Sequence, residues 1–373
     1  MFKKYNRNDP CWCKSGKKYK KCHGHPSHKV KIATSELIKD QSQVYTKDKC
    51  YAPDSLLDEC SDKIIRAHTI SKSTNLKPIS KNEHVYCFQA SFGGMIKSNG
   101  KLTIEKTSIK KTSIFHGFCS KHDAELFREI DLDFDISSEH IFLNHYRTLT
   151  RELYLKEKNS IYQKSKMKTY DKGMDFMQQI IFQNHIEGIS SGTDAGHRDL
   201  KITKSSLDKK LVERNYDDIK YYALVIDSIP DIMSTGVWVV SSDFKNNQLA
   251  DLSDLSKNYN AMSISTLLYS ENKGVILFSW DGSIESPECF SFIETLHLLS
   301  DVDKVKATVY WLFAVNENIF FSPKWWENLL PSKQQQLSNI FHSTLMDLPD
   351  LSLYESLDVV SWNINEIKTN IEL

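Results

Sequence analysis

Residues 7–24 of the chain read RNDPCWCKSGKKYKKCHG. Cys11 and Cys13 stand one residue apart, and the adjacent pair Cys22 and His23 follows after a polar stretch. Three thiolates and one imidazole are sufficient to surround a zinc ion tetrahedrally. The spacing therefore predicts a metal-binding segment, called the knuckle below.

The residues between the ligand pairs favour their convergence on one ion. Ser15 and Gly16 suit a tight turn that leads the chain back. One Trp and one Tyr give the segment almost no apolar core, so metal binding has to supply its folding free energy, on the order of 10 kcal/mol. A disulfide is the alternative, but Cys-x-Cys has poor geometry for one.

The knuckle resembles the SEC-C motif, the zinc-binding tail of the bacterial protein-export motor, which recurs on many otherwise unrelated bacterial proteins. The run N-D-P-C, the turn S-G-K-K-Y-K and the closing C-H-G all agree with that pattern. Trp12 and Lys14 depart from the usual Pro and Gly, and neither is a ligand. The resemblance implies zinc ligation and the docking of a partner, with these ligands: Cys11, Cys13, Cys22 and His23.

Charge is distributed unevenly along the chain. Residues 1–31 contain ten Lys or Arg and a single acidic residue, Asp9, so this arm carries +9 in a chain of zero net charge. A basic arm on an acidic body favours binding to an acidic protein partner, a nucleic acid or an acidic membrane surface. A merely solvated run of charges remains open, because lysines belong to the SEC-C pattern itself.

The sequence shows neither a signal-peptide core nor an apolar run of about 18 residues. We therefore expect a cytoplasmic protein without a membrane span, whose eight cysteines are reduced. A Gly-rich phosphate loop and a Gly-x-Ser-x-Gly elbow are also missing from the sequence, so nucleotide hydrolysis and serine chemistry have no support.

The 373 residues predict an α+β protein of several parts. These are the knuckle at 1–28, a linker at 29–49, an α+β unit at 50–135, a helical segment at 136–216 and a C-terminal α+β domain at 217–373. Periodicity predicts strands at 84–90, 101–109, 221–229, 236–242, 261–269, 274–280 and 308–315. It predicts helices at 34–41, 120–130, 137–157, 171–185, 200–215 and 286–300, and after Ser322 and Pro331, with a small-residue loop at 188–197.

A second set of ligand-type residues lies in the unit at 50–135. Cys119 and His122 stand three residues apart at the start of a predicted helix, so both side chains can face one point. With Cys60 and His68 they form another set of two cysteines and two histidines. This arrangement predicts a second zinc site in a treble-clef-like unit.

The same order of parts resembles, weakly, the ββα-metal core of HNH nucleases. That resemblance implies His68 as the general base and Mg²⁺ or Mn²⁺ at the phosphate. It also implies Asn75 or Asn82 as the loop Asn, and His122 or Asp123 as a metal ligand. Because a histidine on structural zinc cannot also be catalytic, three interpretations stay open: a structural treble clef, a nuclease used in toxicity or defence, or unconnected buried residues.

Other residues receive simpler predictions. Cys87 and Cys289 are expected in the core, and His140 and His145 at the surface. Trp325 and Trp326 could stack nucleic-acid bases, but one core anchor and one interface residue is the favoured interpretation. The function predicted overall is a zinc-binding protein whose basic knuckle docks a protein or nucleic-acid partner.

Overall fold

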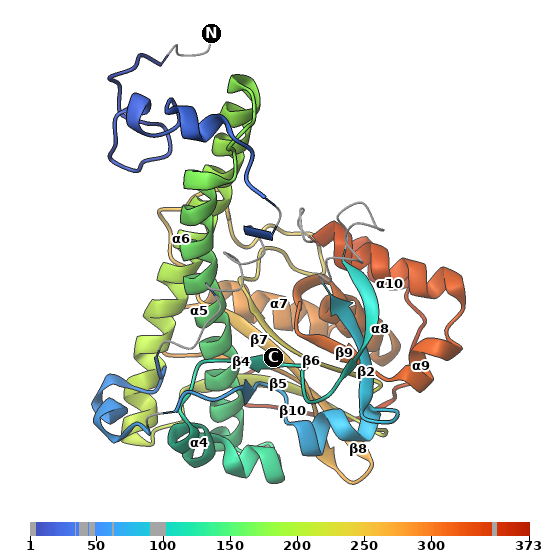
Figure 1. The fold of residues 1–373 in the computed structure, drawn as a ribbon. Helices are drawn as coiled ribbons and strands as arrows, with labels where there is room; N and C mark the ends of the chain where they lie inside the picture. Colours follow the sequence, from blue (N-terminus) through green and yellow to red (C-terminus); the bar gives the residue numbers. More distant parts are fainter. Residues whose placement is uncertain are drawn as a thin grey trace. The chain divides into compact units, whose positions relative to one another are not determined.

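The computed structural model describes residues 5–33, 35–36, 44, 49–61, 63–89, 102–344 and 349–373. The chain forms two compact units: unit 1 contains residues 1–48, 153–198 and 255–258, and unit 2 contains residues 49–152, 199–254 and 259–373. Two long helices, α5 (Ser138–Thr169) and α6 (Phe176–Glu213), contribute residues to both units (Figure 1). The helix predicted at 34–41 lies largely outside the described residues.

Unit 1 combines the knuckle with parts of α5 and α6. The knuckle contains the short 3-10 turn η1 (Tyr19–Lys21), and η2 (Pro26–Lys29) follows it. Ser160 donates to Asp194 at 2.6 Å, which joins α5 to α6 within this unit. The apolar cluster is small and consists mainly of knuckle residues packed on Met167, Phe182 and Ile186. This limited core agrees with a segment that needs a metal ion to be stable.

The loop predicted at 188–197 is wrong, because α6 is one continuous helix. Gly188, Gly192 and Gly196 lie inside it, although each glycine costs about 1 kcal/mol relative to alanine in a helix. The buried side chains of Ser190 and Thr193 face the interior of unit 1 along this stretch. Tertiary packing thus overrides the loop signal of the small residues.

Unit 2 is built on an eight-stranded antiparallel sheet of order β10-β5-β8-β7-β6-β9-β2-β3. This sheet, together with the helices, confirms the α+β class. Strands from the ranges 50–135 and 217–373 share it. In chain order the strands are β2 (His84–Gln89), β3 (Thr103–Ser108), β5 (Ile219–Ile226), β6 (Ile232–Trp238), β7 (Met262–Ser270), β8 (Lys273–Asp281), β9 (Ile319–Phe321) and β10 (Ile364–Thr369).

The two faces of the sheet differ in chemistry because side chains alternate along each strand. Met262 and Ile264 of β7 belong to the main hydrophobic core, together with α7 (Pro287–His297) and α8 (Asp301–Val315). Ser263 and Ser265 point to the other face and hydrogen-bond to α5. The sheet therefore has an apolar face under α7 and α8 and a hydroxyl-rich face under α5.

The strand predicted at 308–315 is also wrong, since these residues form the second half of α8. The run is apolar on all sides, and a short apolar run cannot be assigned to strand or helix by period alone. Ser300 decides the outcome locally, because its side chain accepts a hydrogen bond from the Asp303 amide at the helix start. The helix is then buried on nearly every face.

The remaining elements of unit 2 are short, apart from α4 and α10. They are η3 (Asp54–Glu59), β1 (Ala67–His68), η4 (Lys72–Leu76), α2 (Lys77–Ile79), β4 (Ile114–Phe115), α4 (Ser120–Leu132), α9 (Pro323–Asn328), α10 (Pro331–Thr344) and η5 (Leu351–Ser356). β1 and β4 form a separate two-stranded antiparallel sheet. None of the described helices has the length and apolarity that crossing a membrane requires.

His145 is fully buried, so its predicted surface position is wrong. Its Nδ1 lies 2.8 Å from Ser263 Oγ, and Nε2 has no hydrogen-bond partner in the part of the chain that the structure describes. Burial lowers the pKa of His145 to about 4, against a small opposing effect of Asp281. The imidazole is therefore neutral in the folded protein at pH 7.

This burial predicts an acid-sensitive fold. The unfolded chain protonates His145 near pH 6.5 and the folded chain only near pH 4, so this group's contribution to stability is present above pH 6.5 and is lost as the pH falls. Through His145, the free energy of unfolding of the wild type should fall by about 3 kcal/mol between pH 6.5 and pH 4. This part of the fall should be absent in His145→Gln. Urea unfolding of the wild type and of the variant at several pH values measures this free energy. The exposed His84→Gln variant should retain the wild-type dependence, and an unchanged dependence in His145→Gln would contradict the prediction.

Candidate metal centres

The knuckle brings its four predicted ligands to one point. The ligand atoms of Cys11, Cys13, Cys22 and His23 all lie within 4.8 Å of one another. His23 Nδ1 is 3.0 Å from Cys11 Sγ and 3.4 Å from Cys22 Sγ, and the sulfurs of Cys13 and Cys22 are 3.4 Å apart. A disulfide would bring two sulfurs to about 2.05 Å. The four groups are thus arranged to hold a metal ion.

The backbone of the knuckle produces this convergence. The Cys11 amide donates to Lys17 O at 2.9 Å and the Tyr19 amide donates to Asp9 O at 2.8 Å, so the chain doubles back between the ligand pairs. Gly16 adopts a φ of +72°, which favours glycine. A Cβ on Gly24 would lie 2.8 Å from the Tyr19 ring. The turn predicted from Ser15 and Gly16 is therefore present between the two ligand pairs.

The cysteines of the knuckle differ in acidity. The hydrogen bond between Cys11 and Cys13 raises the pKa of Cys11 and lowers the pKa of Cys13 to about 3. A bound metal ion would displace the remaining protons, because metals bind cysteine as thiolate.

A buried carboxylate supports the histidine of the knuckle. Asp171 lies between α5 and α6, with its Oδ2 2.9 Å from His23 Nε2 and its Oδ1 2.7 Å from His28 Nε2. Gln183 donates to the same carboxylate at 2.9 Å. Burial alone would lower the pKa of His23, but the hydrogen bond to Asp171 reverses this and raises it to about 10. Asp171 thereby orients the ring with Nδ1 toward the sulfurs.

The comparisons with known proteins agree with this geometry. Residues 7–24 match the family model of the SEC-C motif. No curated protein and no solved structure matches the chain. The SEC-C match and the Cys/His cluster together support zinc binding by the knuckle, and they carry no information on the fold of unit 2.

A second Cys/His cluster lies in unit 2, and its membership differs from the predicted set. Cys60, Cys119 and His122 come together as expected, but the fourth member is Cys50. His68 belongs to β1 and to none of the ligand clusters found among the described residues. Cys50 was missed because it stands 69 residues before Cys119 and forms no recognisable motif with it. Its spacing to Cys60 gives no ligand pattern either.

The HNH resemblance is not shown by these findings. His122, one proposed ligand of a catalytic metal, has its Nδ1 within 3.5 Å of Cys50, Cys60 and Cys119. Asn75 is buried and accepts a hydrogen bond from the Leu268 amide at 2.7 Å. Asn82 lies in a turn with a φ of 53°. Burial lowers the pKa of His68, whose Nε2 lacks a hydrogen-bond partner among the described residues.

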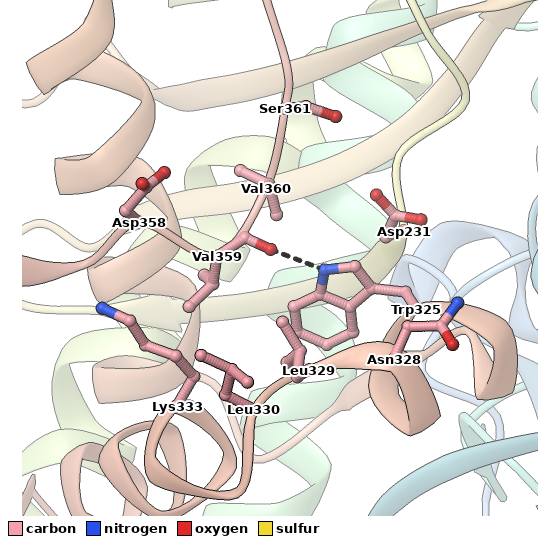
Figure 2. A pocket seen from close by; sticks show the side chains of 10 residues that line it. All are labelled: Asp231, Trp325, Asn328, Leu329, Leu330, Lys333, Asp358, Val359, Val360 and Ser361. Atoms are coloured by element: carbon pink, nitrogen blue, oxygen red, sulfur yellow. Dashed lines mark hydrogen bonds between the residues drawn. The ribbon is translucent and has the colours of Figure 1, made fainter.

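Trp325 and Trp326 are both core residues, with exposed fractions of 9% and 8%. Neither is therefore available for stacking on bases. Trp325 Nε1 donates to Val359 O at 2.8 Å, beside a pocket of ≈ 460 Å³ at α9 and α10. Figure 2 shows Asp231 on one side of this indole and Lys333 with Asp358 on the other. The lining includes no Cys or His that could bind a transition metal.

The contact between Asp171 and His23 predicts the effect of a substitution. Asp171→Asn should lower the zinc affinity of the knuckle by about 10–100-fold, because the charged carboxylate that fixes the tautomer of the ring is replaced by a neutral amide. Competition with a chelator measures the affinity, in a background carrying Cys60→Ser so that only the knuckle titrates. Glu187→Gln, which removes the exposed ion pair with Lys14, serves as the control and should change little. Equal affinities in both variants would contradict the role of Asp171.

Proposed function

We propose that this protein binds zinc through its SEC-C motif and uses the metal-ordered knuckle to dock an acidic protein partner. The observation that carries the proposal is a metal-binding turn whose outward side chains are lysines. Zinc is the metal because three cysteines and one histidine form a soft, tetrahedral donor set.

The interatomic distances support zinc. Ligands at about 2.3 Å (sulfur) and 2.0–2.1 Å (nitrogen) from a tetrahedral zinc stand about 3.5–3.8 Å apart. The two sulfur–nitrogen distances of 3.0 and 3.4 Å and the sulfur–sulfur distance of 3.4 Å fall slightly short of these values. A small outward movement of the side chains would accommodate the ion. All four positions would come from the protein, which is typical of a structural zinc site.

The knuckle presents exposed positive charge. Lys17, Lys18 and Lys21 are exposed, and none of them forms an ion pair with a described residue. Unit 1 as a whole contains 20 Lys or Arg and nine Asp or Glu, a formal net charge of +11, and unit 2 carries −11. Such a concentration of one sign attracts partners of the opposite sign and accelerates their association.

The side chains around these lysines favour a protein partner over a nucleic acid. Single-stranded nucleic acids are bound by aromatic rings on which bases stack, but the rings of the knuckle pack on one another. Trp12 lies 4.8 Å from both Tyr5 and Tyr19, measured between ring centroids. Unit 1 instead exposes aliphatic residues of α6, including Met177 at 42% and Ile181 at 63%. Exposed aliphatic groups are suited to protein contacts.

Charge reversal tests this proposal. The triple variant Lys17→Glu, Lys18→Glu, Lys21→Glu should bind a synthetic acidic amphipathic helix of Glu and Leu at least about tenfold more weakly than the wild type. Zinc content should be unchanged, because no ligand is altered. The same number of reversals at exposed lysines of unit 2, Lys111, Lys245 and Lys273, provides the matched control.

Oligothymidylate is the second probe in the same titration. Tighter binding to oligothymidylate than to the peptide, lost in the knuckle variant, would transfer the docking role to nucleic acid. Equal peptide affinity in the wild type and in both triple variants would refute docking by the knuckle, whatever its zinc content.

A further inference from the structure

We infer that unit 2 holds a second zinc ion, bound by Cys50, Cys60, Cys119 and His122. This site is independent of the SEC-C motif and of the docking function proposed above. Its four ligand atoms lie within 4.8 Å of one another, and three of the four residues are buried. The closed donor set indicates a structural site.

The distances around His122 agree with tetrahedral geometry. Its Nδ1 lies 3.5 Å from Cys50 Sγ, 3.4 Å from Cys60 Sγ and 3.4 Å from Cys119 Sγ. Around a tetrahedral zinc ion, a nitrogen and a sulfur ligand stand about 3.5–3.6 Å apart. The imidazole nitrogen is thus nearly equidistant from three sulfurs, as one corner of a tetrahedron is from the other three.

The backbone around the site is arranged to stabilise thiolates. The Cys119 amide donates to Cys50 Sγ at 3.4 Å, and the His122 amide donates to Cys119 Sγ at 3.5 Å. Cys119 is also the N-cap of α4, a helix of 13 residues, where the helix dipole favours negative charge. Three thiolates and one imidazole around Zn²⁺ carry a net charge of −1, which these donors partly compensate.

Disulfide formation does not account for the cluster. All three of its cysteines are free thiols, and a disulfide would leave an odd thiol beside a histidine. The other two cysteines of unit 2, Cys87 and Cys289, are also buried, but they lie outside every ligand cluster in the described residues. Cys87 instead lies near the hydroxyl of Thr107 in the sheet. In this chain, a buried core cysteine thus differs from a candidate ligand because it lies outside the Cys/His clusters.

The site joins three segments that are distant in sequence. Cys50 precedes Tyr51, whose amide donates to Gly117 O at 2.8 Å and whose carbonyl accepts from Lys204 at 2.9 Å. Cys60 ends η3, and its neighbours reach the start of α4 through the bridge between Ile64 and Cys119. A zinc ion would therefore fix the beginning of unit 2 against α4.

Elemental analysis of the purified full chain tests the inference. Two zinc ions per chain are expected for the wild type, and one for Cys50→Ser. His68→Ala, Cys87→Ser and Cys289→Ser should retain two, which separates the structural set from the set that chain order alone suggested. Cys11→Ser should also leave one ion, and Cys11→Ser combined with Cys50→Ser should leave none.

Misfolding of Cys50→Ser is controlled by two further measurements. Cys50→His, which restores a ligand, should recover the second ion. In a chain whose knuckle is inactivated by Cys11→Ser, Co²⁺ should give the charge-transfer and ligand-field absorption of a tetrahedral site with three sulfurs. A zinc content that Cys50→Ser leaves unchanged, no Co²⁺ spectrum in the Cys11→Ser chain, or loss of an ion in His68→Ala would overturn the inference. Loss of the knuckle ion alone would affect only the function proposed above.

Discussion

A cation stabilises several thiols and an imidazole gathered at one buried point, because thiolates repel one another and the cation compensates their negative charge. This constraint explains why the knuckle can be so poor in apolar residues. Coordination of a metal ion would supply the missing order, and the carboxylate of Asp171 holds His23 in position from outside the turn. The aromatic rings of Tyr5, Trp12 and Tyr19 then complete a very small core. Unit 2 is the opposite case, since its sheet is stabilised by a large apolar core on one face.

The division of charge follows the division of the fold. Unit 1 carries the positive excess and unit 2 the negative excess of a chain that is neutral overall. The zero net charge of the chain is therefore the sum of two units of opposite sign, and the basic unit contains the metal-binding turn. The SEC-C match extends over residues 7–24 alone, so the function of the sheet domain has to be inferred from its own residues.

Local information was sufficient for the knuckle and insufficient for the second cluster. Cys11 and His23 are 12 residues apart, and the turn between them is encoded by Ser15 and Gly16. Cys50 and Cys119 are 69 residues apart, and only the folded chain shows that Cys50 replaces His68. Asp171 is likewise 148 residues from His23. The α+β class and most strands followed from period, whereas the pairing of β2 with β9 depends on contacts that no local pattern records.

The glycines of α6 have a consequence for how the molecule opens. Three residues without a side chain, spaced four apart at Gly188, Gly192 and Gly196, lower the stability of this helical stretch by about 3 kcal/mol relative to alanine. Amide hydrogens of this stretch should exchange with solvent through local opening of the helix rather than through unfolding of the whole unit. The middle of the long helix is therefore less stable than the segments on either side of it, although its backbone is continuous.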